Sequence, residues 1–526
     1  MPRINGAPPR RVHPAVTLVA VCVACGLLPA SLTGTSIALP GISEDLHTSL
    51  TSLQWVVNAY NLTFASVMLA AGALADLLGR RRMFTWGLVV FVACTAGCAA
   101  VSDIVVIDVL RGVAGIGAAM VLTAASALLA HTFDGPSRMR AFGALGSSFG
   151  LGLVLGPSTS GVLIGWGGWR TVFIVHAIVA ALVMLALPFL RESRDPAATG
   201  IDRWGTLTFS GSLFALTLAL VEAPQLGWAS PAVLGLLATF VLLLVAFTVV
   251  ERRQVRPMFD LALFQRPAFT AICLMPVLLA FGFVCLLVFL PSFFIGINGM
   301  SSGRAGATML LLTGPVLLFP VIAGAVSRTV PPRVLLGTSL LLIAAGAAWL
   351  TVIDRDTTVP ALIGPLLVIG TGVGISFGLL DGAALSAVDS SRAGMAAGMF
   401  NTMRLTGEAV AIAGMGALLV TLTRRELTGT LDGFGPYAQD VGTVANRAAQ
   451  GEIAAAAANV PGGQQSAFVD VVSGAYTDAF HTVLWILAAV CAVGAPAIVA
   501  LLRERRTPAA PADLAAAPLT EPAGRP

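Results

Sequence analysis

Five ionisable side chains lie inside long apolar runs of the sequence, and their types suit proton transfer. Asp108 and Arg111 are three residues apart in one run, Arg404 and Glu408 are four apart in another, and Asp381 lies alone in a third. Ionisable groups within a membrane are costly and commonly serve the transport of ions or substrates. A buried carboxyl group suits proton uptake because burial disfavours its charged form. Residues three or four apart also share a helix face, so a static ion pair is the alternative for each pair.

Other chemistries lack the residues they need. All 30 basic residues are Arg, so the Lys of a nucleotide-binding loop is missing and ATP-driven transport is excluded. The five His are scattered, so no nucleophile and base recur together and we expect no enzyme. The seven Cys all lie in apolar runs, which predicts free buried thiols, no metal site and no cofactor. The net charge of +4 comes from dispersed Arg and requires no nucleic-acid partner.

The elements that must position these groups are membrane-spanning helices. The chain has 526 residues, of which 57% are hydrophobic and only 11% charged, whereas a soluble domain carries about a quarter charged residues. A helix crosses the bilayer with about 20 apolar residues, and fourteen runs approach or exceed that length. The predicted class is therefore an all-α polytopic membrane protein. The predicted spans are 16–39, 54–75, 83–102, 104–130, 141–164, 170–190, 205–223, 231–250, 268–290, 303–326, 334–352, 361–386, 395–419 and 480–502.

The distribution of Arg predicts the orientation. With the N-terminus inside, 22 Arg lie in inner segments and 6 in outer ones. Because inner loops of membrane proteins are enriched in basic residues, we expect a multi-pass protein of the cytoplasmic (inner) cell membrane with both termini cytoplasmic. Residues 421–478 form the expected outside loop, with an Ala-rich middle that can be helical. Residues 503–526 are rich in Pro and Ala and are expected to be a disordered cytoplasmic tail.

The turn after the second span carries a motif with a clear physical meaning. It contains Gly72, Asp76, Gly79, Arg80 and Arg81, in which the glycines permit a tight turn and close packing. Asp76 lies at a helix end, where it can accept charge-assisted hydrogen bonds and form a conformational latch. The alternative is a simple positively charged turn capped by Asp76.

The fifth span contains a second motif, in which small residues are four apart. Gly152 and Gly156 form a groove for another helix, and Gly161 continues the motif. Pro157 is expected to kink this helix and to leave one carbonyl group without its helical partner.

Together with the fourteen spans, these motifs resemble those of the 14-helix drug:proton antiporter family of the major facilitator superfamily. The resemblance implies two six-helix bundles, 14–192 and 259–502, joined by a central loop and an inserted two-helix hairpin at 193–258, with a short cytoplasmic tail at 1–13. Inserted helices that act only as a lipid-facing spacer are the alternative. The resemblance also links Arg111 to proton coupling and the Gly152–Gly161 motif to antiport, with Ser160 replacing a family Gly.

The second span opens with Trp55, Asn58, Tyr60 and Asn61, which are expected to line the substrate path, with helix packing as the alternative. Relatives commonly carry an acidic residue in the first span where this chain has Ser31. That difference argues against monovalent organic cations as the sole substrates.

We therefore expect a monomeric, proton-coupled transporter that exports drugs, antibiotics or other small amphipathic compounds by alternating access. An importer or a lipid-linked metabolite transporter on the same fold is the first alternative. A membrane enzyme or a sensor is the second, although no soluble signalling domain is appended to the spans.

Overall fold

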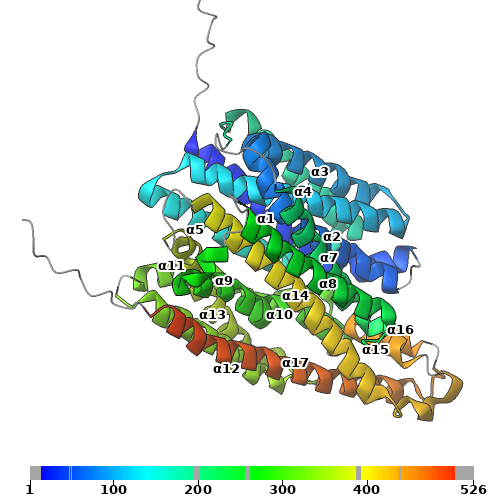
Figure 1. Ribbon diagram of the computed structural model, residues 1–526. Helices are drawn as coiled ribbons and strands as arrows, with labels where there is room; N and C mark the ends of the chain where they lie inside the picture. The colour runs from blue at the N-terminus through cyan, green and yellow to red at the C-terminus, as the bar shows by residue number, and fades with distance from the viewer. Residues whose placement is uncertain are drawn as a thin grey trace, which may run out of the picture.

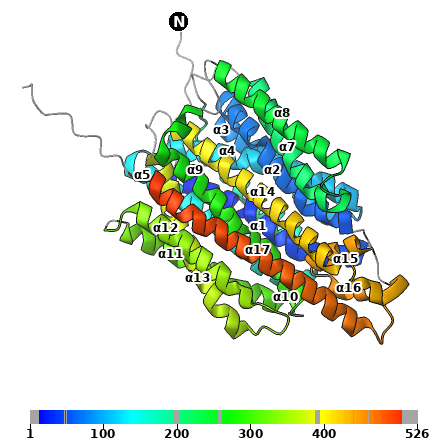
Figure 2. The same cartoon turned by 60° about the horizontal axis from the view of Figure 1, so that its bottom comes forward.

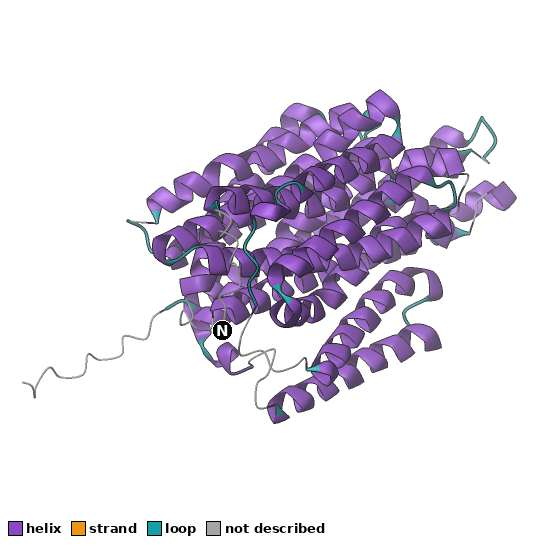
Figure 3. Cartoon of the chain, turned by 90° about the horizontal axis from the view of Figure 1, so that it is seen from above, coloured by secondary structure: helices purple, strands orange, loops and turns teal. Residues whose placement is uncertain are grey.

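The computed structural model describes residues 13–503 except 47, 49, 195–201, 255–260, 328, 387–392, 438–439 and 459. Its regular elements over these residues are helices, packed side by side in one bundle (Figure 1, Figure 3). The long helices are α1 (Pro14–Leu46), α2 (Leu50–Leu78), α3 (Arg80–Ala100), α4 (Ile104–Thr132), α5 (Gly135–Gly167), α6 (Trp169–Met184), α7 (Arg203–Leu226), α8 (Pro231–Arg253), α9 (Pro267–Leu279), α10 (Cys285–Gly296), α11 (Ser302–Val326), α12 (Pro332–Trp349), α13 (Val359–Ser386), α14 (Ala393–Leu427) and α17 (Gln465–Leu501).

The described helices provide fourteen spans when each bent helix is counted once. Twelve stretches of helix without a sharp bend are long and apolar enough to cross a bilayer. Helices α2 and α5 are bent by 54° and 42°, and each supplies one further span. Helices α9 and α10 form a single span because they are joined by a π-helical turn, Ala280–Val284. The all-helical polytopic class and the number of spans agree with the sequence prediction.

Helices α1–α6 pack mainly on one another, and α9–α14 pack with α17. The two groups meet where α5 contacts α11 and α13, and where α2 contacts α14. Helix α7 packs against both α2 and α14, so it touches both groups, whereas α8 packs chiefly on α7 (Figure 2). Most of the α8 surface is exposed on the outside of the bundle. Helix α7 is therefore packed into the bundle, whereas α8 lies at its periphery.

The segment between the last two spans is shorter than the expected loop 421–478. Helix α14 continues to Leu427 and α17 begins at Gln465. A hydropathy run ends where the lipid ends, whereas backbone hydrogen bonding carries a helix on into water, which explains the difference. The described part of the intervening segment holds a 3₁₀ helix, Leu431–Tyr437, and two short α-helices, α15 (Val441–Ala449) and α16 (Ile453–Ala457), in its Ala-rich middle.

Candidate functional site

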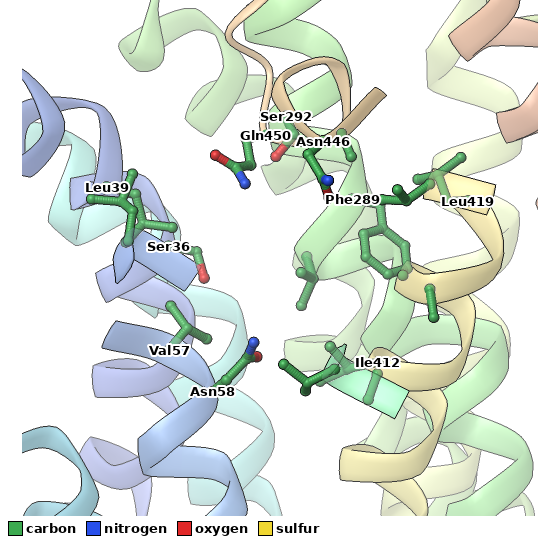
Figure 4. Close-up of a pocket in the computed structure, with 18 of the residues that line it drawn as sticks. Ser36, Leu39, Val57, Asn58, Phe289, Ser292, Ile412, Leu419, Asn446 and Gln450 are labelled. Carbon is green, nitrogen blue, oxygen red and sulfur yellow. The ribbon is translucent and has the colours of Figure 1, made fainter. Parts of the chain in front are cut away.

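A cavity of about 180 Å³ lies between the two groups of helices, close to α15. We call this end of the bundle the outer end, because the predicted orientation places it outside. Helices α1 and α2 line one side of the cavity, and α10 and α14 line the other (Figure 4). Helix α7, which packs on both α2 and α14, also contributes to the lining. Helix α15 and the turn that follows it cover the top and form the roof of the cavity. Pockets for drug-sized ligands usually measure about 300–1,000 Å³, so this cavity must widen to hold one.

The cavity wall is mostly apolar, with neutral polar groups at a few positions. Ser36 of α1 and Asn58 of α2 face the cavity from one side, and Phe289 and Ile412 face it from the other (Figure 4). The remaining polar lining residues belong to α10 and the roof: Ser292, Asn446, Gln450 and Glu452. Glu452 is the one charged residue of the described lining, and it lies at the roof.

The roof rests directly on α10 through a backbone contact. Gly451 turns the chain with φ of +80°, a conformation that favours glycine. A Cβ atom added to Gly296 would lie 2.3 Å from the Gly451 Cα, so only glycine fits at this approach. Burial raises the pKa of the neighbouring Glu452, and the Glu44 carboxylate raises it further, while the Arg447 guanidinium opposes both.

Arg111 is fully buried among α1, α2 and α4. Its Nε donates a hydrogen bond to the Val56 carbonyl oxygen at 2.9 Å, and its Nη1 donates one to Ser31 Oγ at 3.1 Å. The guanidinium lies 4.3 Å from the centroid of the Tyr60 ring, within range of a cation–π interaction. Its Nη2 is buried without a hydrogen-bond partner among the described residues. Ser31 thus contacts Arg111 as a neutral acceptor.

The static pair of Asp108 and Arg111 is not formed. Both side chains are described, and no ion pair within 4.0 Å joins them. One carboxylate oxygen of Asp108 is buried without a hydrogen-bond partner in the described part of the chain. The physical reason is that Arg111 extends away from its own helix to acceptors on α1 and α2.

Glu408 lies on α14 at the interface between the two groups of helices. Its side chain is only 7% exposed and borders two small cavities of about 10 Å³ each. One of them is shared with Pro29, Phe64 and Phe149 from the opposite group, and also with Asn61. A cavity of this size has room for about one water molecule.

Arg404 does not neutralise Glu408 through a close contact. Although the two are four residues apart on α14, no ion pair within 4.0 Å joins these described side chains. The Arg404 guanidinium instead lies 4.1 Å from the centroid of the Phe149 ring on α5. The alternative of a static i,i+4 ion pair is therefore not formed, because Arg404 makes a cation–π contact across the interface. Asp381 lies on α13, and its side chain is outside the described part of the structure.

The glycines of α5 pack directly against α1. A Cβ atom added to Gly152 would lie 1.8 Å from the Gly26 carbonyl oxygen, and one added to Gly156 would lie 2.1 Å from Thr33 Oγ1. Ser160 is accommodated by Gly34, whose added Cβ would lie 2.2 Å from the Ser160 hydroxyl. The predicted groove is thus occupied by α1, and Gly161 lies half-buried at the end of the motif.

Pro157 has the effect on α5 that its chemistry predicts. Proline cannot donate to the carbonyl four residues earlier, which here belongs to Leu153. The bend of 42° separates the segments that end at Leu153 and begin at Leu155. Thr33 Oγ1 lies 3.3 Å from the Leu153 carbonyl oxygen and 3.0 Å from that of Pro29, so its one proton can serve either acceptor. A side chain of α1 therefore compensates for the missing backbone donor.

The turn between α2 and α3 forms a network with the segment that follows α6. Gly79 has φ of +113°, and a Cβ atom there would lie 2.7 Å from a carboxylate oxygen of Glu192. The Arg81 backbone N–H donates to that same oxygen at 3.1 Å. Asp76 pairs with Arg80 at 3.0 Å, one turn further along the chain. The predicted tight turn is present at Gly79, while Gly72 makes only an ordinary contact with Thr123 and needs no close backbone approach.

A family model described as the Major Facilitator Superfamily matches residues 19–412. The chain belongs to the major facilitator superfamily.

Relatives of this superfamily member have names that concern drug and antibiotic resistance. Puromycin resistance protein pur8 of Streptomyces alboniger is 34% identical over 415 residues, which cover 78% of this chain and 82% of that protein. Tetracenomycin C resistance and export protein of Streptomyces glaucescens is 30% identical, covering 78% and 77%. Multidrug resistance protein Stp of Mycobacterium tuberculosis is 30% identical, covering 73% and 72%.

Solved structures support the fold of the superfamily member at low sequence identity. A bacterial homologue of the human lysosomal transporter Spinster, in an inward-facing and occupied conformation, matches with a TM-score of 0.60 and 16% identity. The match covers 94% of this chain and 97% of that one. The human organic anion transporter MFSD10 matches with a TM-score of 0.54 and 17% identity, covering 91% and 100%.

The structure separates the four residues expected to line the substrate path. Asn58 lines the outer cavity, whereas Asn61 borders the small cavity beside Glu408. Tyr60 is fully buried, and its hydroxyl donates to the Leu28 carbonyl oxygen at 3.2 Å, so it packs beside Arg111. Trp55 borders none of the three described cavities. The direction in which each side chain points on α2 decides this separation.

Sequence reasoning missed Glu192 and Gln450. Glu192 follows a span in a charged segment, and nothing local shows that it reaches the turn at Gly79. Gln450 lies in the long loop, which the hydropathy pattern treats as outside the bundle. The tendency of Gly451 to permit a turn was the one available signal for the roof.

Proposed function

We propose that this protein is a proton-driven exporter of small amphipathic compounds across the cytoplasmic membrane. Support comes from membership of the superfamily and from relatives named for resistance to puromycin and for export of tetracenomycin C. The observation that carries proton coupling is Glu408, a buried carboxyl group between the two groups of helices with no close ion pair. In this proposal the protein is a transporter rather than an enzyme, it acts as a monomer, and both termini are cytoplasmic.

Protonation of Glu408 would change how tightly the two groups of helices pack. A neutral carboxyl group is tolerated among Pro29, Phe64 and Phe149, whereas a carboxylate there needs water or a cation. Proton uptake therefore favours the packed interface seen here, and proton loss favours opening of the interface to water. A single site that both groups of helices share can in this way drive alternating access.

Each group of helices must stay rigid while it rocks against the other. The α1–α5 contact meets this requirement, because its glycines allow very close approach. The backbone at Gly152 lies against the backbone of Gly26, and the backbone at Gly156 lies against the Thr33 hydroxyl. Larger side chains at such positions would force α1 and α5 apart. We infer that α1 and α5 move together and that the contact between Arg404 and Phe149, which joins the two groups, breaks during transport.

The proton gradient supplies enough free energy for the export of a neutral compound. One proton entering the cell gains about 2.3 kcal/mol per 100 mV of membrane potential. One unit of pH difference adds about 1.4 kcal/mol. The total of about 3.7 kcal/mol sustains a concentration ratio of several hundredfold for one neutral molecule per proton.

Inverted membrane vesicles test the proposed function. Vesicles that contain the protein are energised with an acidic interior, and accumulation of puromycin and tetracenomycin C is measured with and without an uncoupler. We expect accumulation of at least one compound above the level of empty vesicles, and its loss when the uncoupler is added. Accumulation that survives the uncoupler would refute proton coupling, and uptake into whole cells instead of vesicles would refute export.

A further inference from the structure

The roof of the outer cavity carries an amide group that has no partner in the protein. Both the Nε2 and the Oε1 atoms of Gln450 are buried, and neither makes a hydrogen bond with a described residue. Figure 4 shows the side chain entering the cavity from above. A buried amide without partners is costly, so a bound molecule that supplies a donor and an acceptor stabilises it.

The side-chain amide of Asn446, the other amide of the roof, already makes a hydrogen bond within the protein. Asn446 lies on α15, about one helical turn before Gln450, which follows the end of that helix. The Asn446 Nδ2 donates to the Gly442 carbonyl oxygen at 2.9 Å. The contact between Gly451 and Gly296 holds the following turn against α10. Gln450 is therefore placed by a fixed backbone while its amide remains available.

The other groups around the cavity indicate what kind of molecule fits. Asn58 and Ser36 offer neutral hydrogen-bonding groups opposite the α14 side, which is apolar at Ile412 and Leu419 (Figure 4). Glu452 is the one charged residue in the described lining, and Arg447 acts on it electrostatically from within the same loop. A permanent anion would lose water here without meeting an opposite charge in the described lining, and a permanent cation would meet only Glu452 at the roof, on which Arg447 already acts.

We propose that Gln450 is a specificity-determining residue that binds an uncharged, amphipathic substrate through paired donor and acceptor groups, such as those of an amide or of a hydroxyl beside a carbonyl. The inference rests on the proposed function, because it names the substrate class of that exporter. It adds that a loop outside the spans completes the binding site. The substrate lies between neutral groups of α1 and α2 on one side and the Gln450 amide above.

The test compares an uncharged compound with a permanent cation in inverted vesicles. Chloramphenicol is uncharged and carries an amide and hydroxyl groups, whereas ethidium is a permanent cation. Transport is measured for the parent protein and for Gln450→Leu, Gln450→Asn and Gln464→Leu. Gln464 is a matched control, because it is exposed at the start of α17 and lies outside the cavity lining.

We expect Gln450→Leu to raise the KM for chloramphenicol at least tenfold while kcat changes less than twofold. Gln450→Asn should recover part of this loss because it retains both polar atoms, and Gln464→Leu should match the parent. A KM unchanged by Gln450→Leu would overturn the inference, as would transport of ethidium without chloramphenicol. Transport of neither compound would overturn it as well.

The uncoupler separates this inference from the proposed function. If chloramphenicol transport depends on Gln450 but persists with the uncoupler present, the binding role stands and proton coupling fails. If transport collapses with the uncoupler but ignores Gln450, the proposed function stands and the binding role fails.

Discussion

Replacement of Arg111 by Met should abolish export while leaving the fold nearly as stable as before. Arg111 is a fully buried cation with no carboxylate within ion-pairing distance among the described residues. A structural role would require that its removal destabilise the bundle. A role in proton coupling predicts instead that removal of its charge and of its unpartnered Nη2 abolishes transport while the fold is kept.

The contacts of Arg111 allow the stability change to be bounded. Its hydrogen bonds to Val56 and Ser31 contribute about 1.5–3 kcal/mol each, because the donor is charged. Burial of the guanidinium costs several kcal/mol, and Met avoids that cost while filling much of the same volume. The two terms cancel to within about 2 kcal/mol. For a bundle of this size, that difference shifts the Tm by about 4–8 °C at most.

The assay measures thermal unfolding in detergent and transport in inverted vesicles for the same preparations. We expect Arg111→Met to unfold within about 8 °C of the parent and to lose accumulation against a gradient. Arg140→Met is the control, since Arg140 is exposed at the inner end of α5. A large loss of folded protein that accounts for the loss of transport would refute the reasoning, as would normal accumulation by Arg111→Met.

Three further predictions concern packing, the inner turn and the roof. Gly152→Ala should destabilise the protein by about 1–3 kcal/mol in detergent unfolding, because its Cβ would meet the backbone of α1. Gly143→Ala on the same helix is the control, because its Cβ meets nothing within 4 Å and should not destabilise the protein. Gly79→Ala should cost about 1–3 kcal/mol in the same assay because of its positive φ, and a stability equal to that of the parent would contradict the described turn. The raised pKa of Glu452 means that the closed roof favours its neutral form, so the roof should be most stable at low external pH and weaken as the pH rises through that pKa. The rate at which maleimide labels Asn58→Cys, corrected for ionisation of the thiol, reports how open the roof is and should therefore be slower in acid. Glu452→Gln should remove this pH dependence of the labelling rate. A pH dependence that persists in Glu452→Gln would contradict the role of Glu452.

The number of spans follows from the sequence because lipid imposes a strong and local requirement. Each crossing helix must be apolar for about 20 residues, and this can be counted without knowing the partners of any helix. The bend and the groove of α5 were also predictable, since Pro157 and the spaced glycines act through local geometry. Their partner was not predictable, because nothing within 152–161 specifies that α1 occupies the groove.

The interaction partners of the buried ionisable groups, in contrast, could not be predicted from the sequence. Sequence spacing correctly placed Arg111 near Asp108 on one helix, but it gave no information about acceptors on other helices. Arg111 instead reaches Ser31 and Val56, which are distant in sequence. Arg404 likewise contacts Phe149 across the interface rather than Glu408. Spacing rules fail here because a long side chain chooses among neighbours that only the tertiary fold brings together.

The roof could not be predicted for a related reason. The segment is polar, short in helices and separated from every span by Gly-rich stretches, so its pattern resembles that of an ordinary loop. The backbone contact between Gly451 and Gly296, together with the packing of α15 on α10, α14 and α17, holds it over the cavity. Binding residues in such a segment become recognisable once their unpartnered atoms are seen to face a cavity.

Proton coupling through Glu408 is tested most directly by substrate accumulation and substrate exchange in the same proteoliposomes. The Glu408→Gln protein keeps the size and polarity of the side chain but cannot release a proton, and Glu426→Gln at the exposed end of α14 is its control. We predict that Glu408→Gln exchanges substrate at equal pH but no longer accumulates it against a gradient when a pH difference is imposed, while Glu426→Gln behaves as the parent. Accumulation by Glu408→Gln at the parental level under the same pH difference would contradict the account.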